Sequence, residues 1–177
     1  MAEADPAAAL AAIIRDVPDF PRPGVLFKDV TTLLRDAAAY REAIDRLAEA
    51  WRHTPVDIVV GVESRGFVLG GALAYLLGAG FVPARKEGKL PSERIGLSYS
   101  LEYGEARLEM HTDAIAHGER VLVVDDLLAT GGTAAATIEL VRQLGGDAVG
   151  VTFLVELAFL GGAARLGDLP RVSLVTF

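Results

Sequence analysis

The sequence predicts an α/β fold, with a mainly parallel central sheet flanked by helices, in a single domain covering residues 1–177. Short apolar runs alternate along the chain with segments of helical periodicity, which is the pattern of strand–helix–strand units. Residues 121–124 read Val-Leu-Val-Val, as expected of a central strand covered on both faces. The length of 177 residues suits one domain, and no internal repeat or long linker divides it.

Each element is located by its hydrophobic pattern. Tyr40, Ile44, Leu47 and Trp51 recur at helical spacing and predict a helix over residues 36–53. The polar, glycine-marked stretch that follows the second strand predicts an excursion or a hairpin over residues 87–103. The other predicted elements are a strand at 56–62, a helix at 66–77, strands at 81–84 and 121–124, a helix at 131–144, and strands at 148–155 and 172–175.

Residues 66–84 carry no charged side chain and approach the length of about 20 residues that spans a bilayer. Five glycines and Pro83 interrupt this stretch, and Gly78-Ala79-Gly80 is typical of a helix end followed by a new strand. A buried helix and a buried strand explain it better than a membrane span. The first twenty residues hold a single basic residue, Arg15, so no secretory signal is indicated, and we expect a cytoplasmic protein.

Composition excludes several kinds of chemistry. The net charge of −7 and the isoelectric point near 4.9 argue against a nucleic-acid-binding surface, which needs a basic patch. The absence of cysteine excludes disulfides, thiolate metal sites and cysteine nucleophiles. Three histidines leave little room for histidine-based metal or triad chemistry.

The most informative segment joins a hydrophobic strand to two acids and a glycine loop. Ligands of open parallel sheets bind beyond the carboxyl ends of the strands, which is where Asp125 and Asp126 are predicted. Their carboxylates can accept hydrogen bonds from the two hydroxyls of a ribose. The loop that follows offers backbone N–H groups and hydroxyls to a phosphate at a helix start, from Ala129, Thr130, Gly131, Gly132 and Thr133.

Other phosphate motifs do not fit this segment. It has neither the Gly-Lys-Ser/Thr of a Walker loop nor the G-x-G-x-x-G of a dinucleotide fingerprint. An acidic turn followed by a capped helix is the structural alternative. The pattern favours a sugar-phosphate site.

This segment resembles the signature for 5-phosphoribosyl diphosphate (PRPP) in type I phosphoribosyltransferases. Five further segments resemble the adenine-specific branch of that family, in the same order and over nearly the whole chain, at residues 18–29, 63–67, 85–91, 99–104 and 154–157. The resemblance implies the type I phosphoribosyltransferase fold, with a small hood formed by about residues 1–35 and the C-terminal segment. It also implies an enzyme of purine salvage that uses PRPP and adenine, with Mg²⁺, to give AMP and diphosphate.

The resemblance further implies a role for each matching residue. The 5′-phosphate and ribose of PRPP would be bound by Asp125, Asp126, Ala129, Thr130, Gly131, Gly132 and Thr133. Diphosphate would be bound by Glu63, Ser64, Arg65, Arg85, Lys86, Lys89 and Tyr103. Adenine would be bound by Val25, Leu26, Phe27, Lys28 and Leu157.

Glu102 and Arg65 are the catalytic candidates, with Glu102 handling a proton of the purine ring. Mg²⁺ would be bound mainly by PRPP itself, with Asp125 and Asp126 reaching it through water. The family implies a homodimer, and it often has a cis peptide at the position of Glu63–Ser64, where many relatives carry Asp in place of Glu63.

The basic cluster also stands out from the residues alone. The chain has only three lysines, yet Lys86 and Lys89 lie beside Arg85 after a predicted strand. A solvated loop is the alternative. Two other functions stay open: a phosphoribosyltransferase for another purine base, and a non-catalytic protein of the same fold that senses PRPP or purines.

Overall fold

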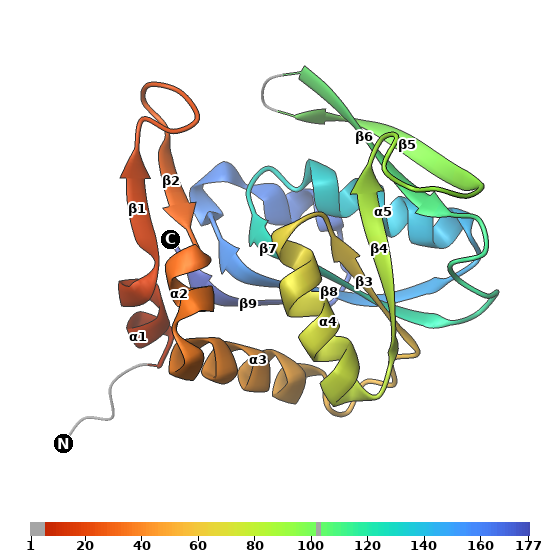
Figure 1. Ribbon diagram of the computed structural model, residues 1–177, viewed down its shortest axis with the longest axis horizontal. Helices are drawn as coiled ribbons and strands as arrows, with labels where there is room; N and C mark the ends of the chain where they lie inside the picture. The colour runs from red at the N-terminus through yellow and green to blue at the C-terminus, as the bar shows by residue number, and fades with distance from the viewer. Residues whose placement is uncertain (1–5, 102–103) are drawn as a thin grey trace.

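A seven-stranded sheet with the order β5-β6-β4-β3-β7-β8-β9 forms the centre of the computed structural model, which describes residues 6–101 and 104–177 (Figure 1). Five neighbouring strands run parallel to one another: β4 (Gly80–Lys86), β3 (Ile58–Val62), β7 (Arg120–Leu128), β8 (Asp147–Glu156) and β9 (Arg171–Thr176). The antiparallel pair of β5 (Arg94–Leu101) and β6 (Gly104–His111) extends the sheet beyond β4. The predicted α/β fold with a mainly parallel sheet is confirmed.

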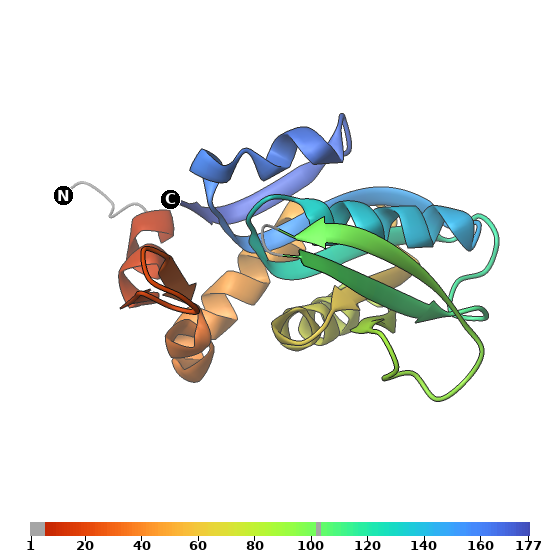
Figure 2. The same cartoon turned by 90° about the horizontal axis from the view of Figure 1, so that it is seen from above.

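Helices cover both faces of this sheet (Figure 2). On one face, α3 (Ala37–Trp51) and α4 (Arg65–Leu77) pack against alternate strand residues such as Val59 and Leu122. On the other face, α5 (Gly132–Gln143) and the short 3-10 helix η2 (Gly162–Leu166) pack against Val60 and Val123. This alternation follows from the two-residue period of a strand and explains why the central strands are apolar throughout.

The N-terminal segment forms a small layer of its own beside the sheet (Figure 1). It consists of α1 (Pro6–Ile13), the antiparallel strands β1 (Arg15–Pro18) and β2 (Leu26–Asp29), and α2 (Thr31–Arg35). These elements were not predicted individually, because strands of four residues and a helix of five give no periodicity that a sequence can display. Within the described residues, no helix has the length and apolarity needed to cross a membrane.

The predicted elements of the main domain are found with small differences at their ends. The difference that matters most for the site concerns β7, predicted to end at residue 124, which continues to Leu128 and so contains both Asp125 and Asp126. Its pairing with β8 continues beyond the apolar run, as far as Leu128 opposite Glu156. The excursion predicted at 87–103 is a loop followed by the β5–β6 hairpin, which extends to His111.

Candidate active site

The two acids of β7 lie in a buried position near the carboxyl end of the parallel sheet. Asp125 and Asp126 are 8% and 7% exposed, and the backbone N–H of Asp126 donates to Asp125 Oδ1 at 2.8 Å. The carboxylate of Asp126 forms an ion pair with Arg65. Burial, followed by the neighbouring Asp126 charge, raises the pKa of Asp125 well above its usual range.

Glycine at position 66 explains how Arg65 reaches Asp126. A Cβ atom on Gly66 would lie 2.9 Å from the carbonyl oxygen of Val124 and 3.2 Å from Asp125 Oδ1. The first turn of α4 therefore packs directly on the β7 backbone, which a larger residue would prevent. The Arg65 side chain at the helix start is thereby brought beside the acids.

The loop between β7 and α5 is fixed by a second close backbone approach. Gly131 has a φ of +80° and precedes the first helical residue, Gly132. A Cβ atom on Gly131 would lie 2.3 Å from the carbonyl oxygen of Gly162, and one on Gly162 would lie 2.1 Å from the carbonyl oxygen of Ala129. The start of η2 thus supports the loop from behind while the helix start faces the ligand edge of the sheet.

A cavity of about 430 Å³ joins this loop to the N-terminal layer. Most of the predicted ribose, phosphate and adenine residues line it together: Val25, Leu26, Phe27, Lys28, Arg65, Asp125, Ala129, Thr130, Gly131, Gly132, Thr133 and Leu157. Five further lining residues were not predicted from the sequence: Pro21, Leu127, Leu128, Ala134 and Leu160. Four of them flank predicted site segments, so their closeness in sequence to these segments was the available signal; Leu160 lies one helical turn after Leu157.

The hood wall of the cavity holds one aromatic ring, Phe27, and one cation, Lys28, whose side chain is 11% exposed. The Phe27 ring meets Phe20 edge-on at a centroid distance of 5.1 Å, and the guanidinium carbon of Arg65 lies 5.8 Å from its centroid. Lys28 Nζ contacts Asp16 Oδ1 at 2.6 Å and lies 3.8 Å from the centroid of Phe177. The charge of Lys28 is therefore neutralised within the hood.

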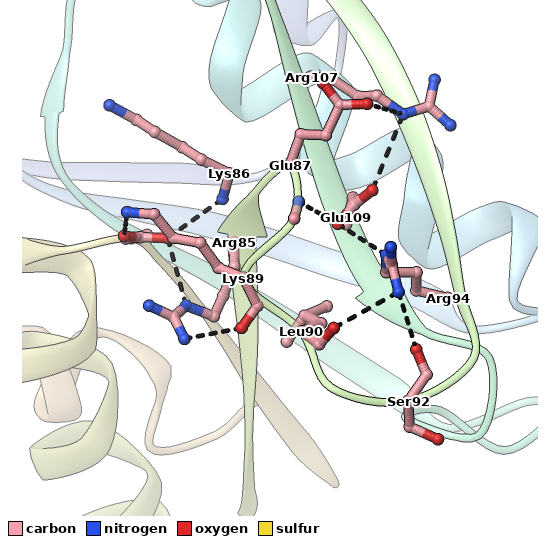
Figure 3. Close-up of polar contacts among 11 residues, drawn as sticks. Arg85, Lys86, Glu87, Lys89, Leu90, Ser92, Arg94, Arg107 and Glu109 are labelled. Carbon is pink, nitrogen blue, oxygen red and sulfur yellow. Dashed lines mark hydrogen bonds and ion pairs between the residues drawn. The ribbon is translucent and has the colours of Figure 1, made fainter.

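Five of the predicted diphosphate residues lie outside the cavity lining, which Arg65 shares: Glu63, Ser64, Arg85, Lys86 and Lys89. We call residues 85–89 the cation loop (Figure 3). The Glu63 carboxylate accepts from the Lys86 backbone N–H at 3.1 Å and from Arg85 Nε at 3.3 Å, and it forms an ion pair with Lys89. The Glu63–Ser64 peptide is cis, as the resemblance implies.

The partners of the Glu63 carboxylate stabilise its ionised form. Burial acts to raise its pKa, but the hydrogen bonds from Lys89, the Lys86 amide and Arg85 outweigh burial and hold the pKa below its ordinary value. Asp126, Ser64 and the cation loop are not among the residues that line the cavity. Glu102 and Tyr103 lie outside the described residues, so their predicted roles stay predictions.

Comparison with known proteins agrees with this geometry. The model of the phosphoribosyl transferase domain family matches residues 29–162, which defines the chain as a phosphoribosyltransferase of type I fold. An adenine phosphoribosyltransferase from Nitrobacter hamburgensis is 54% identical over 170 residues, with 95% of each chain covered.

Two solved structures of that family are also similar. The adenine phosphoribosyltransferase from Rhodothermus marinus has a TM-score of 0.94 and 50% identity, over 99% of this chain and 100% of that one. The enzyme from Saccharomyces cerevisiae, solved in complex with an imino-altritol bisphosphate and adenine, has a TM-score of 0.89 and 41% identity, over 97% of this chain and 99% of that one. The chain belongs to the adenine phosphoribosyltransferase family.

Proposed function

We propose that this protein is an enzyme of purine salvage that transfers the 5-phosphoribosyl group of PRPP to adenine, giving AMP and diphosphate. The observation that carries the proposal is the cavity, in which a sugar-phosphate loop and a purine-sized apolar wall face each other. Relatives that are more than 50% identical over nearly the full chain are named adenine phosphoribosyltransferase. The other functions considered, transfer to another purine and ligand sensing, have no observation of their own in their favour.

In this proposal the loop at residues 129–133 binds the 5′-phosphate of PRPP. Its amide groups lie at the start of α5, a helix of 12 residues whose dipole favours an anion there. Thr130 and Thr133 add hydroxyl donors. Asp125 and Asp126 accept hydrogen bonds from the ribose hydroxyls, and the raised pKa of Asp125 reflects the strong desolvation of this position.

The adenine ring would occupy the hood side of the cavity. Phe27 and Leu157 line this part and would cover the two faces of the ring. The backbone of residues 25–28 would supply donors and acceptors to the N6 amino group and N1 of adenine. Arg65, which bridges Asp126 and Phe27, would link the base-binding and ribose-binding halves.

Mg²⁺ would arrive with PRPP, bound mainly by its phosphate and ribose oxygens. Among the described residues, no three histidine, aspartate or glutamate side chains gather into a metal site. Two adjacent carboxylates suit a hard ion that keeps several waters and takes its other ligands from a phosphate substrate. Asp125 and Asp126 would therefore reach the ion through water, where it offsets charge on the departing diphosphate.

Catalysis would consist of holding both reactants in line while charge separates. The ribose carbon becomes cationic and the diphosphate gains negative charge as the bond between them breaks. The side chains of Arg85, Lys86 and Lys89, together with the backbone of Ser64 and Arg65, would stabilise the diphosphate. Glu102 would handle the proton of the purine ring, and Tyr103 would brace the segment that closes over the site. We propose further that the enzyme is cytoplasmic and homodimeric.

The direct test is product formation from PRPP and Mg²⁺ with adenine, hypoxanthine, guanine and uracil in parallel assays. We expect AMP to form from adenine and no nucleotide to form from the others. Turnover of an oxo purine would show that the hood pocket selects a different base. Tight binding of PRPP or AMP without any turnover would support a sensor instead.

A paired substitution tests the ribose-binding role. Asp125→Asn with Asp126→Asn should lower kcat/KM at least about a hundredfold, because the ribose loses both of its acceptors. Circular dichroism should show the same secondary structure as the parent protein. Near-normal turnover in the double variant would contradict the role of these acids.

A further inference from the structure

Glu63 is the centre around which the cation loop is arranged. It follows the last residue of β3, and its side chain is only 9% exposed. One oxygen accepts from Arg85 and from the Lys86 amide, while the other is paired with Lys89. The Arg85 guanidinium also donates to the carbonyl oxygen of Lys89 at 3.0 Å, which ties the two cations together. A single carboxylate thus determines where two cationic side chains lie.

The three cations of the loop are not equivalent. Arg85 and Lys89 are neutralised by Glu63, whereas the ammonium of Lys86 pairs with no carboxylate in the described part of the chain. The Lys86 side chain extends away from the Arg85 and Lys89 group (Figure 3). An anion approaching the loop would therefore meet one available cation and two that already have a partner.

A second buried carboxylate holds the backbone of the loop independently of Glu63. Glu109, which is 5% exposed, accepts from the Gly88 N–H at 2.9 Å and contacts Arg94 Nε at 3.0 Å (Figure 3). The loop is therefore held from the β6 side as well. Arg85 and Lys89 can change partner without the loop losing its position.

We propose that Glu63 is a positioning residue that acts as an internal counterion: it holds Arg85 and Lys89 in place and is displaced from them by diphosphate. This inference rests on the proposed diphosphate-binding role of the cation loop. A carboxylate and a diphosphate cannot share these cations without repelling each other, so the two anions compete. Glu63 thereby weakens diphosphate binding and speeds the release of this product.

The direction in which Glu63→Gln changes diphosphate binding distinguishes this role from a merely structural one. Glu63→Gln keeps an oxygen acceptor for the Lys86 amide but removes the competing charge. The dissociation constant for diphosphate, measured by calorimetry in the presence of Mg²⁺, should fall about tenfold, the scale of one partly buried charge at contact distance. The KM for PRPP should fall too, and kcat should fall where diphosphate release limits turnover.

Two variants serve as controls. Glu63→Asp keeps the charge and should not tighten diphosphate binding. Glu87→Gln removes a carboxylate from the same loop that faces Arg107 at 3.7 Å instead of the cation group, and should change the dissociation constant less than about twofold. If Glu87→Gln tightened diphosphate binding as much as Glu63→Gln does, the effect would come from the loss of any nearby negative charge, and the inference would be overturned.

The remaining outcomes are also decisive. Weaker or unchanged diphosphate binding in a folded Glu63→Gln protein would overturn the counterion role while leaving the proposed function intact. If Glu63→Gln does not fold, Glu63→Asp, which retains the charge, takes its place. Tighter diphosphate binding by Glu63→Asp would contradict competition between the carboxylate and diphosphate, and diphosphate binding no tighter than in the parent protein would support it. No diphosphate binding by the parent protein would instead refute the proposed function of the loop.

Discussion

Asp125 illustrates a conflict between stability and function at a single residue. Its carboxylate is buried beside a second carboxylate, which raises its pKa in the folded chain. The unfolded chain ionises near pH 4, so the folded state binds more protons above that pH. Stability from this group is therefore fully present below about pH 4 and is lost as pH rises toward the folded pKa. The position proposed to bind ribose hydroxyls thus costs the unliganded fold free energy at neutral pH.

Asp125→Asn should accordingly stabilise the fold while it impairs PRPP binding. We expect the free energy of unfolding at pH 7 to rise by about 0.5–2 kcal/mol, and the gain to disappear toward pH 4. Urea denaturation at several pH values measures both. Asp36→Asn is the matched control, because Asp36 caps α3 from an exposed position and asparagine caps equally well. A destabilised Asp125→Asn protein at pH 7 would show that its carboxylate is ionised and well compensated.

The residues that sequence alone could identify are those with local signatures. Asp125, Asp126 and the glycine loop were recognisable because strand, acids and loop are adjacent in the chain. The partners of Glu63 could not be recognised in this way, since the Glu63 carboxylate contacts a loop that lies 22 to 26 residues away in the sequence. The close approach of Gly131 to Gly162 depends on tertiary packing in the same way.

Elements differ in how far their sequences determine them. Helices α3, α4 and α5 and the central strands were predictable because each buries a long apolar stripe or run. The hood strands bury little, with all but one residue of β1 exposed, and their pairing depends on contacts between segments. Strand β7 was predicted too short because its acids look like a strand end, although β8 pairs with it as far as Leu128.

The element η2 yields a prediction about residues 129–133, which we call the phosphate loop after its proposed role. Gly162→Ala places a Cβ atom on the Ala129 carbonyl, so either η2 or the loop must shift. Overpacking of this kind costs about 1–3 kcal/mol of unfolding free energy, and the displaced loop should raise the dissociation constant for AMP. Calorimetric titration with AMP and urea denaturation together measure the two effects.

Gly71→Ala in α4 is the control for that substitution. A Cβ atom at Gly71 would meet nothing within 4 Å, so alanine should stabilise the helix by about 0.5–1 kcal/mol and leave AMP binding unchanged. If Gly162→Ala binds AMP as the parent does, the phosphate loop does not depend on η2 for its conformation.

At the scale of the whole molecule, the site is a junction between two layers. The carboxyl ends of the sheet strands contribute Asp125, the loop at residues 129–133 and Leu157, while the N-terminal layer contributes residues 25–28. Because a parallel sheet gathers its carboxyl ends at one edge, the position of the proposed sugar-phosphate half follows from the fold itself. The proposed purine half requires the hood to lie over that edge. The position of the hood depends on how the N-terminal segment packs against the rest of the domain.

The proposed homodimer needs a surface, and α4 offers one. Four of the seven large hydrophobic side chains exposed among the described residues lie on α4 or the adjacent β4: Val68, Tyr75, Leu76 and Phe81. Val68, Tyr75 and Leu76 share one face of the helix by their spacing. Tyr75 is 86% exposed, an unfavourable position for an aromatic ring unless a partner covers it.

Charge on this face should therefore separate the subunits. Val68→Asp with Tyr75→Asp should shift the mass in sedimentation equilibrium from twice 18.7 kDa to 18.7 kDa, because two carboxylates from each subunit would be buried without partners in a dimer interface. Phe159→Asp is the control: Phe159 is 74% exposed in η1 (Ala158–Leu160), on the side of the molecule away from α4 (Figure 2), and its substitution should leave the mass unchanged. A parent protein that sediments as a monomer would contradict the homodimer. A variant that still sediments as a dimer would show that the interface lies on another face, because four buried and unpaired carboxylates would cost more than a typical interface can offset.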